Sequence, residues 1–225
     1  MPKSNSANAV YLVTFAPLAK TQAGRQAIAR FGLPPFIDGS IRREPDFQHP
    51  LPAMTCLCRA DKFVPRLRTG DHVVHMTQRS AFGLGRIQQR LVSVLRVIAE
   101  CGSHDEAAAY YRDHGMKLPG NLLVDGNGPE PFNRSHQEHS AKPGCVAVAT
   151  EWDRSYQARA TRYPQVRICM PAFCCVDWEA PEVTGQHLRQ AFGKIPGTQN
   201  PGKNSIDELQ QMLSALGIRA TLNRL

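Results

Sequence analysis

The stretch from Gly70 to Glu100, GDHVVHMTQRSAFGLGRIQQRLVSVLRVIAE, contains two apolar runs separated by a polar loop. The first run, His72 to Thr77, follows a Gly-Asp turn, and the second, Leu91 to Glu100, is rich in Val, Leu and Ile. This composition predicts two β-strands. Because the connection between them is short, we expect the two strands to be direct neighbours in one sheet.

Turn and capping residues around this pair predict the other elements of the fold. Ser103, followed three positions later by Glu106, forms a capping-box pattern, and Gly115 stands where such a helix would end. The other strands are expected at about Ala9–Phe15, Met54–Cys58, Cys145–Ala149 and Val166–Val176, the last broken by Pro171. The other helices are expected at Thr21–Arg30, at Asp153–Tyr163, after Thr184 and after Ser205. Between them, Leu118 to Pro143 is dense in Pro, Gly and Asn and predicts a long loop.

The chain has 225 residues, of which 42% are hydrophobic and 20% are charged, as is ordinary for a globular protein. Its 27 Lys and Arg residues against 19 Asp and Glu residues leave a net charge of +8. Much of the excess lies between Arg59 and Arg96, and a second basic run extends from Arg154 to Arg167. Two basic runs on one surface are typical of proteins that bind DNA or RNA, although a solvated basic face would give the same pattern.

Seven cysteines in a chain of this length are an odd number and include close pairs such as Cys56 and Cys58. This pattern predicts reduced thiols in a cytoplasmic protein. No run approaches the roughly 18 apolar residues that span a bilayer, so no membrane partner is expected.

The order of these elements resembles the core of PUA-like barrels of the EVE, ASCH and YTH type. In these barrels a Gly-Asp before a strand, followed by a strand ending in V-x-E, is a recurring pattern, which here would be Gly70-Asp71 and the strand from Leu91 to Glu100. The segments DGSIRREPD, TCLCR and NLLVDGNGPEP also resemble bacterial and phage proteins grouped as nucleotide-modification-associated domains. The resemblance implies an α+β fold, a small PUA-like β-barrel with peripheral helices over residues 8–178. Residues 179–225 are then expected to form a C-terminal helical extension packed on the barrel.

The resemblance further implies a module that recognises a nucleobase, often a modified one, in a pocket at the barrel mouth. An extruded base must be stacked and hydrogen-bonded to offset its unstacking. The candidate walls of such a pocket are Phe36, Phe47, Phe132, Trp152 and Tyr156.

The segment FIDGSIRREPDF, Phe36 to Phe47, contains charges of both signs without a helical period. Such a loop suits a nucleotide, because Arg42 or Arg43 can bind phosphate while a carboxylate accepts hydrogen bonds from an exocyclic amine or a ribose hydroxyl. The candidate carboxylates are Asp38, Glu44 and Asp46. The alternative is a surface turn whose charges neutralise one another.

Further candidate binding residues are taken from the basic runs and from the long loop. These are Arg59, Asn121, Asn127, His136, Trp152, Tyr156 and Arg159. His136 and His139 near Cys145 do not have the spacing of strong zinc motifs, so neither a metal nor a cofactor is expected.

The sequence contains no nucleophile elbow, phosphate-binding glycine loop or paired-metal motif. A nucleic-acid-binding module is therefore favoured. The alternative is a nucleotide- or base-processing hydrolase on the same fold, which would use a carboxylate or histidine as its acid and base.

Overall fold

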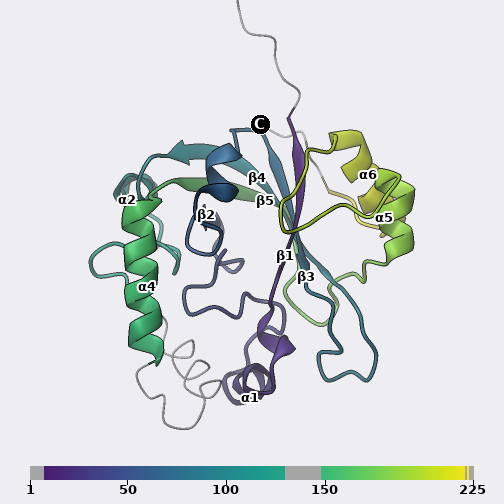
Figure 1. The fold of residues 1–225 in the computed structure, drawn as a ribbon, viewed down its shortest axis with the longest axis horizontal. Helices are drawn as coiled ribbons and strands as arrows, with labels where there is room; N and C mark the ends of the chain where they lie inside the picture. The colour runs from purple at the N-terminus through teal and green to yellow at the C-terminus, as the bar shows by residue number, and fades with distance from the viewer. Residues whose placement is uncertain (1–7, 130–147, 221, 223–225) are drawn as a thin grey trace, which may run out of the picture.

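The computed structural model describes residues 8–129, 148–220 and 222. Within these residues a five-stranded sheet has the order β1-β3-β4-β5-β2 and curls into a half-barrel (Figure 1). The strands are β1 (Val10–Phe15), β2 (Ala53–Thr55), β3 (His72–Thr77), β4 (Leu91–Cys101) and β5 (Val166–Cys174). The expected α+β class with a curled sheet is therefore confirmed, whereas membership of the PUA-like group stays a prediction.

The predicted pair, β3 and β4, lies at the centre of the sheet and is antiparallel, which confirms that the two strands are neighbours. β1 is parallel to β3, and the other neighbours are antiparallel. The break expected at Pro171 is wrong, because β5 continues through this residue. Pro171 lies opposite Leu95 at a register irregularity, where a residue without an N–H disturbs the ladder least.

The two acids of the Gly-Asp and V-x-E pattern hold the turn that precedes β3. The Asp71 carboxylate accepts from the N–H groups of Ala9 and Arg68, both over 2.9 Å. The Glu100 carboxylate, at the far end of β4, accepts from the N–H of Thr69 over 2.9 Å. Gly70 has a φ of 95°, which favours glycine. In this chain the pattern therefore has a structural role.

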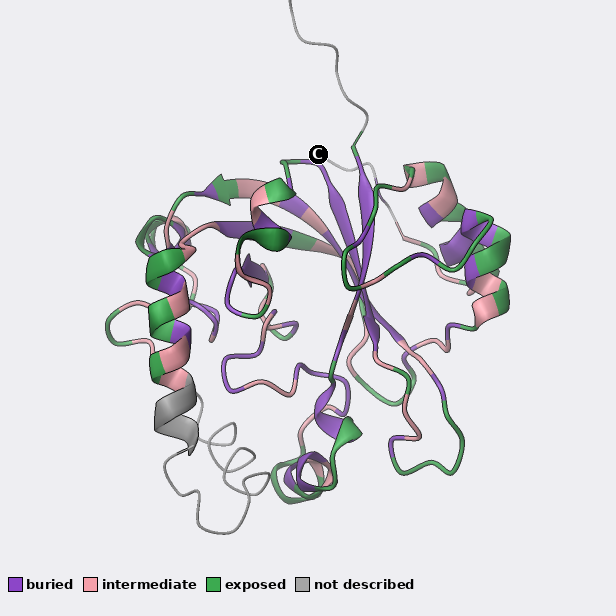
Figure 2. Ribbon diagram, in the orientation of Figure 1, coloured by how far each residue is buried: buried purple, intermediate pink, exposed green. Residues whose placement is uncertain are grey.

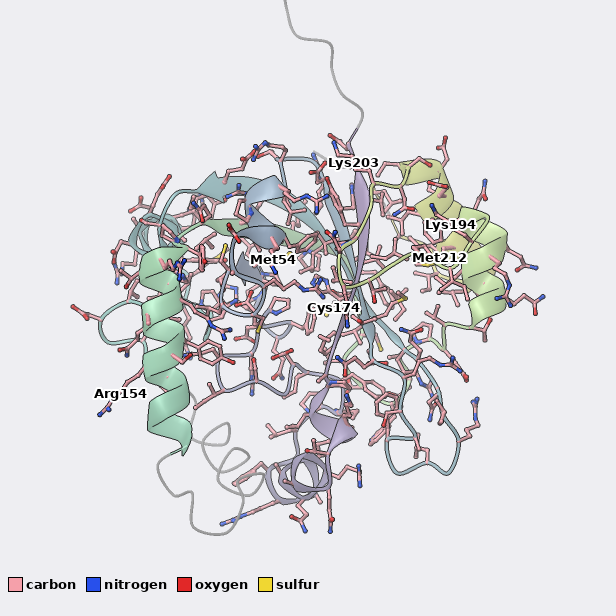
Figure 3. The ribbon with its side chains drawn as sticks, viewed as in Figure 1. Met54, Arg154, Cys174, Lys194, Lys203 and Met212 are labelled. Carbon is pink, nitrogen blue, oxygen red and sulfur yellow. The ribbon has the colours of Figure 1, made fainter. Side chains whose placement is uncertain are left out.

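Both faces of the sheet are buried, as Figure 2 shows for the central strands. Alternating residues of β1 point to opposite faces, so that Val13 joins one core cluster and Leu12 joins the other. On the side of Leu12, helices α5 (Gly185–Phe192) and α6 (Ile206–Ala215) pack on the sheet through residues such as Met212, which Figure 3 labels. The C-terminal residues thus share a hydrophobic core with the strands.

The other helices lie at the margins of the sheet (Figure 1). They are α1 (Gln22–Phe31), α2 (His104–Asp113) and α4 (Val148–Arg162), and short 3-10 turns occupy Leu18–Lys20, Ala60–Lys62 and Val64–Arg66.

Capping confirms the predicted helix starts at Ser103, Thr184 and Ser205, each of which accepts from a backbone N–H of its own first turn. In α2 the Glu106 side chain departs from the expected capping box, because it accepts from the N–H of Gly102.

Two sequence-based boundaries were wrong. Residues 148 and 149 of the strand expected at Cys145–Ala149 begin helix α4, and residues 145–147 lie outside the described part of the chain. Helix α4 therefore starts five residues before the predicted Asp153. The prediction failed because a short apolar run is compatible with a strand or with a helix. Strand β2 also ends three residues earlier than expected, at Thr55.

Candidate functional site

A pocket of about 370 Å³ lies inside the curl of the sheet. Residues of both edge strands line it, including Val13 of β1 and Thr55 of β2, so the sheet bends around it. Figure 3 shows Met54, another lining residue, in the interior of the molecule. The polar side chains on its wall are Thr14, Thr21, Asp38, Ser40, Glu44, Thr55, Cys58, Arg59, His75 and Tyr156.

Asp38 enters the pocket from the loop that follows α1. The backbone on either side of it is fixed beside the end of β1, because Leu18 N–H donates to Ile37 O and Gly39 N–H donates to Ala16 O. The Oδ1 atom of Asp38 accepts from Ser40 N–H over 2.9 Å, from the Ser40 hydroxyl and from Glu44 N–H over 3.1 Å. This local arrangement is an Asx turn, and it fixes the direction of the carboxylate.

Glu44 is the second carboxylate of the pocket and is held by three donors. Its Oε1 atom accepts from Thr55 N–H over 2.6 Å, and its Oε2 atom accepts from the Thr55 hydroxyl and from Asn121 Nδ2, the latter over 3.0 Å. Asn121 is fully buried, and its Nδ2 also donates to Ala53 O over 2.7 Å. Glu44 therefore joins the loop to β2 and to the segment around Asn121.

Both carboxylates have pKa values near neutrality. Burial raises the pKa of Asp38 to about 6, although hydrogen bonds from Ser40 and Glu44 oppose the rise. Burial also raises the pKa of Glu44 to about 7 against the hydrogen bonds from Thr55 and Asn121. Two acids with pKa values in this range, in one cavity, are suited to general acid-base chemistry.

Besides the two carboxylates and the cationic Arg59, the titratable side chains on the described pocket wall are uncharged at neutral pH. Burial, together with the charge of Arg59, lowers the pKa of His75 to about 3, and its Nδ1 lies 3.1 Å from the Ser93 hydroxyl. Cys58 is exposed, but desolvation of its thiol in the cavity and the two carboxylates raise the pKa of that thiol; burial also raises the pKa of the Tyr156 hydroxyl. Cys58 therefore remains a thiol rather than a thiolate, and its nucleophilicity is low.

Arg59 is the cationic residue among the described residues of the pocket wall. Its Nη1 donates to the carbonyls of Thr198 and Gln199, both over 3.0 Å, and its Nη2 donates to Thr14 O over 3.1 Å. The guanidinium also lies over the Phe63 ring at 5.6 Å. Arg59 thus links the pocket wall to the segment before α6 that contains Thr198 and Gln199.

The two arginines of the opening loop lie within the protein. Arg42 is 3% exposed and forms a bidentate ion pair with Asp153 of α4, with Nε–Oδ1 at 2.6 Å and Nη2–Oδ2 at 3.1 Å. Arg43 is 7% exposed, has a φ of 48°, and donates from Nη1 to Gln48 Oε1 over 2.6 Å. Arg43 Nη1 also lies 3.6 Å from Asp46 Oδ1, an ion pair within the loop. The two arginines of the Phe36–Phe47 segment are therefore buried and paired within the protein, unlike those of a solvated surface turn.

Of the other predicted binding residues, Tyr156 of α4 lines the pocket. Asn127 braces the loop around it, since its Nδ2 donates to Pro119 O and Leu122 O and its carbonyl accepts from Arg42 Nη1. Arg159 donates to Leu57 O over 2.6 Å.

His136 lies outside the described residues, and Trp152 belongs to α4 without a described side chain. The structure thus brings Asp38, Glu44, Arg59 and Tyr156 to one pocket, with Asn121 behind Glu44.

Of the predicted aromatic wall residues, Tyr156 lines the pocket, whereas Phe36 and Phe47 have a different role. Phe36 is fully buried and packs edge-on against Phe82 and Trp178. Phe47 packs against Phe15 and the His75 ring. Phe132 lies outside the described residues. The described aromatic side chains on the pocket wall are instead Phe15, Phe63 and Tyr156.

Sequence reasoning missed Ser40, Thr55, Cys58 and His75. His75 and Thr55 carried a usable signal, because each is a polar residue that directly follows an apolar residue of its strand, Val74 and Met54 respectively. The side chains of Thr55 and His75 face the pocket because the sheet curls around it, and the alternation of residues along a strand does not specify this curl.

Comparison with protein-family models, with curated proteins and with solved structures finds no match to the chain. Within the described residues, no helix is both long enough and apolar enough to cross a membrane. The same residues contain no group of three or more His, Cys, Asp or Glu side chains arranged to hold a metal ion.

Proposed function

We propose that the protein binds a nucleobase in the Asp38–Glu44 pocket. The observation that carries this proposal is the placement of two near-neutral carboxylates on the wall of one cavity whose other surfaces are largely apolar. Its volume of about 370 Å³ is within the range of small-molecule sites. Carboxylates accept hydrogen bonds from the N–H groups of bases, and aromatic side chains provide stacking surfaces.

The base would reach the pocket as part of DNA or RNA, or as a free nucleoside. The resemblance to PUA-like barrels supports the first route, because such folds take up extruded bases. The net charge of +8 supports it as well, since a basic protein attracts a polyanion. Arg154 is exposed next to Asp153, and Figure 3 shows its side chain pointing away from the body of the molecule.

The geometry also favours a second candidate, a nucleotide- or base-processing hydrolase. Asp38 is fixed through Oδ1, and its pKa of about 6 leaves it ionised at neutral pH and able to take a proton from water. The water oxygen would form a bond to carbon while the carbon–nitrogen bond breaks. The proton taken by Asp38 would then pass to the leaving nitrogen.

The experiment that tests the binding proposal is a titration of the full chain with short oligonucleotides that contain single unmodified and modified bases. Wild type, Asp38→Asn and Asp125→Asn are compared. Asp125 is exposed and lies outside the pocket, so it is a matched control for the loss of one carboxylate. We expect Asp38→Asn to lose base preference while Asp125→Asn retains it. Equal preferences in all three proteins would contradict the proposal, and product formation lost only in Asp38→Asn would establish the hydrolase.

A further inference from the structure

The described part of the pocket presents an acceptor to a ligand at Asp38. The Oδ1 atom of Asp38 takes three donors, whereas Oδ2 takes none from the described residues. Oδ2 is also not among the fully buried polar atoms that lack a partner, so it is accessible from the cavity that Asp38 lines.

The donors around this acceptor are already engaged. Thr55 directs both its N–H and its hydroxyl to Glu44, and Asn121 divides its two N–H bonds between Glu44 and Ala53 O. The Ser40 hydroxyl donates to Asp38. Around the two carboxylates the wall therefore offers an acceptor at Asp38 while these neighbouring donors are engaged, and it favours a ligand that brings its own N–H groups.

The arginines near the pocket are also engaged, through their own protein contacts. Arg59 donates to three backbone carbonyls, Arg42 binds Asp153 and two carbonyls, and Arg159 donates to Leu57 O. A phosphate inside the cavity would face Asp38 and Glu44, and the one arginine among the described lining residues, Arg59, already donates to three carbonyls.

We propose that the pocket takes the amino-bearing edge of a base, as in cytosine, adenine or guanine, while any phosphate stays outside. This inference rests on the proposed function. An amino group donates directly to Asp38 Oδ2. The corresponding edge of uracil or thymine carries carbonyl oxygens on both sides of its single N–H, and these oxygens would face a carboxylate.

The experiment is a calorimetric titration of the full chain with cytidine, adenosine, guanosine and uridine, and with the 5′-monophosphate of the tightest binder. We expect at least one amino-bearing nucleoside to bind ten-fold or more tightly than uridine, and the monophosphate to bind no more tightly than its nucleoside. Asp38→Asn should reduce the preference over uridine to less than three-fold, because an amide can donate to a carbonyl. Asp125→Asn should keep the preference of wild type.

The outcomes separate this inference from the proposed function. Uridine binding as tightly as every amino-bearing nucleoside would overturn the inference and leave nucleobase binding intact. A monophosphate that binds ten-fold more tightly than its nucleoside would also overturn it. If none of the four nucleosides binds at millimolar concentration and the oligonucleotides show no base preference, the proposed function itself fails.

Discussion

The backbone N–H of Glu44 donates to Oδ1 of Asp38 over 3.1 Å, so the two acidic residues of the pocket are joined by one turn of the chain. Each carboxylate also raises the pKa of thiol and hydroxyl groups around it, such as Cys58. Burial is the main cause of the raised Glu44 pKa, and the charge on Asp38 adds to it, so the two acids titrate as neighbours rather than independently.

The first prediction concerns stability and pH. The pKa of Asp38 is about 6 in the folded protein, against an ordinary value of about 3.9 in an unfolded chain. A raised pKa means that the contribution of Asp38 to stability is complete below about pH 4 and is lost as pH rises through 6. Asp38→Asn should therefore stabilise the fold by about 1–2 kcal/mol at pH 8 and have little effect at pH 4, as measured by urea denaturation.

The control for this prediction is Asp125→Asn, which removes an exposed carboxylate and should change stability by less than about 0.5 kcal/mol at either pH. Taking the difference between variant and wild type at each pH removes the opposite contribution of His75, whose lowered pKa costs stability as pH falls below about 6.5. An Asp38→Asn variant that is less stable than wild type at pH 8 would contradict the prediction.

The second prediction concerns the hydrogen bonds that hold Glu44. Thr55→Val removes the hydroxyl that donates to Oε2 and keeps the backbone N–H that donates to Oε1. Because a hydrogen bond to the ionised form lowers a carboxyl pKa, its loss should move the Glu44 pKa above its value of about 7. A carbon-13 NMR titration of the Glu44 carboxyl measures this change directly, and an unchanged midpoint in a folded variant would show that the hydroxyl does not bind Glu44.

The third prediction concerns the ion pair between the opening loop and helix α4. Arg42→Ala leaves Asp153 without its bidentate partner and should cost about 3 kcal/mol in the free energy of unfolding. Arg154→Ala removes the exposed arginine beside Asp153 and should cost less than about 0.5 kcal/mol. If both variants lose the same stability in chemical denaturation, Arg42 does not have the structural role described here.

The fourth prediction concerns the basic surface. If nucleic acid delivers the base, oligonucleotide affinity should fall with salt by a slope of about 0.7 to 0.9 per phosphate contacted. Arg154→Glu should reduce that slope by about one contact without loss of folding. Arg159→Glu should instead destabilise the protein, because the Arg159 guanidinium donates to Leu57 O. An affinity that does not change with salt would exclude phosphate contacts by the protein.

Much of the fold could be predicted because its signals are local. The Gly70–Asp71 turn, the apolar run of β4 and the capping residues Ser103 and Ser205 each act within a few positions of the chain. The start of α4 could not be predicted in this way, since its first residues are apolar and small and suit a strand as well. The course of β5 through Pro171 depends on an irregular register with β4, which is a tertiary property.

The candidate site could be predicted only in part. Asp38, Glu44 and Tyr156 were chosen from their residue types, and the structure places them on one wall. Arg42 and Arg43 were expected at phosphates, but their partners are 111 and 5 positions away in the sequence, at Asp153 and Gln48, and the first of these cannot be identified without the fold. His75 lies on the wall because the sheet curls, and no short motif encodes that curvature.

The central claim is that a base donates to Asp38 within this pocket. The most direct test is the carbon-13 titration of the Asp38 carboxyl with and without the tightest-binding nucleoside. A donor to the ionised carboxylate should lower the Asp38 midpoint below about 6 and make binding tighter as pH rises through that value. A midpoint that stays unchanged while the nucleoside is bound would place the ligand elsewhere and contradict the account.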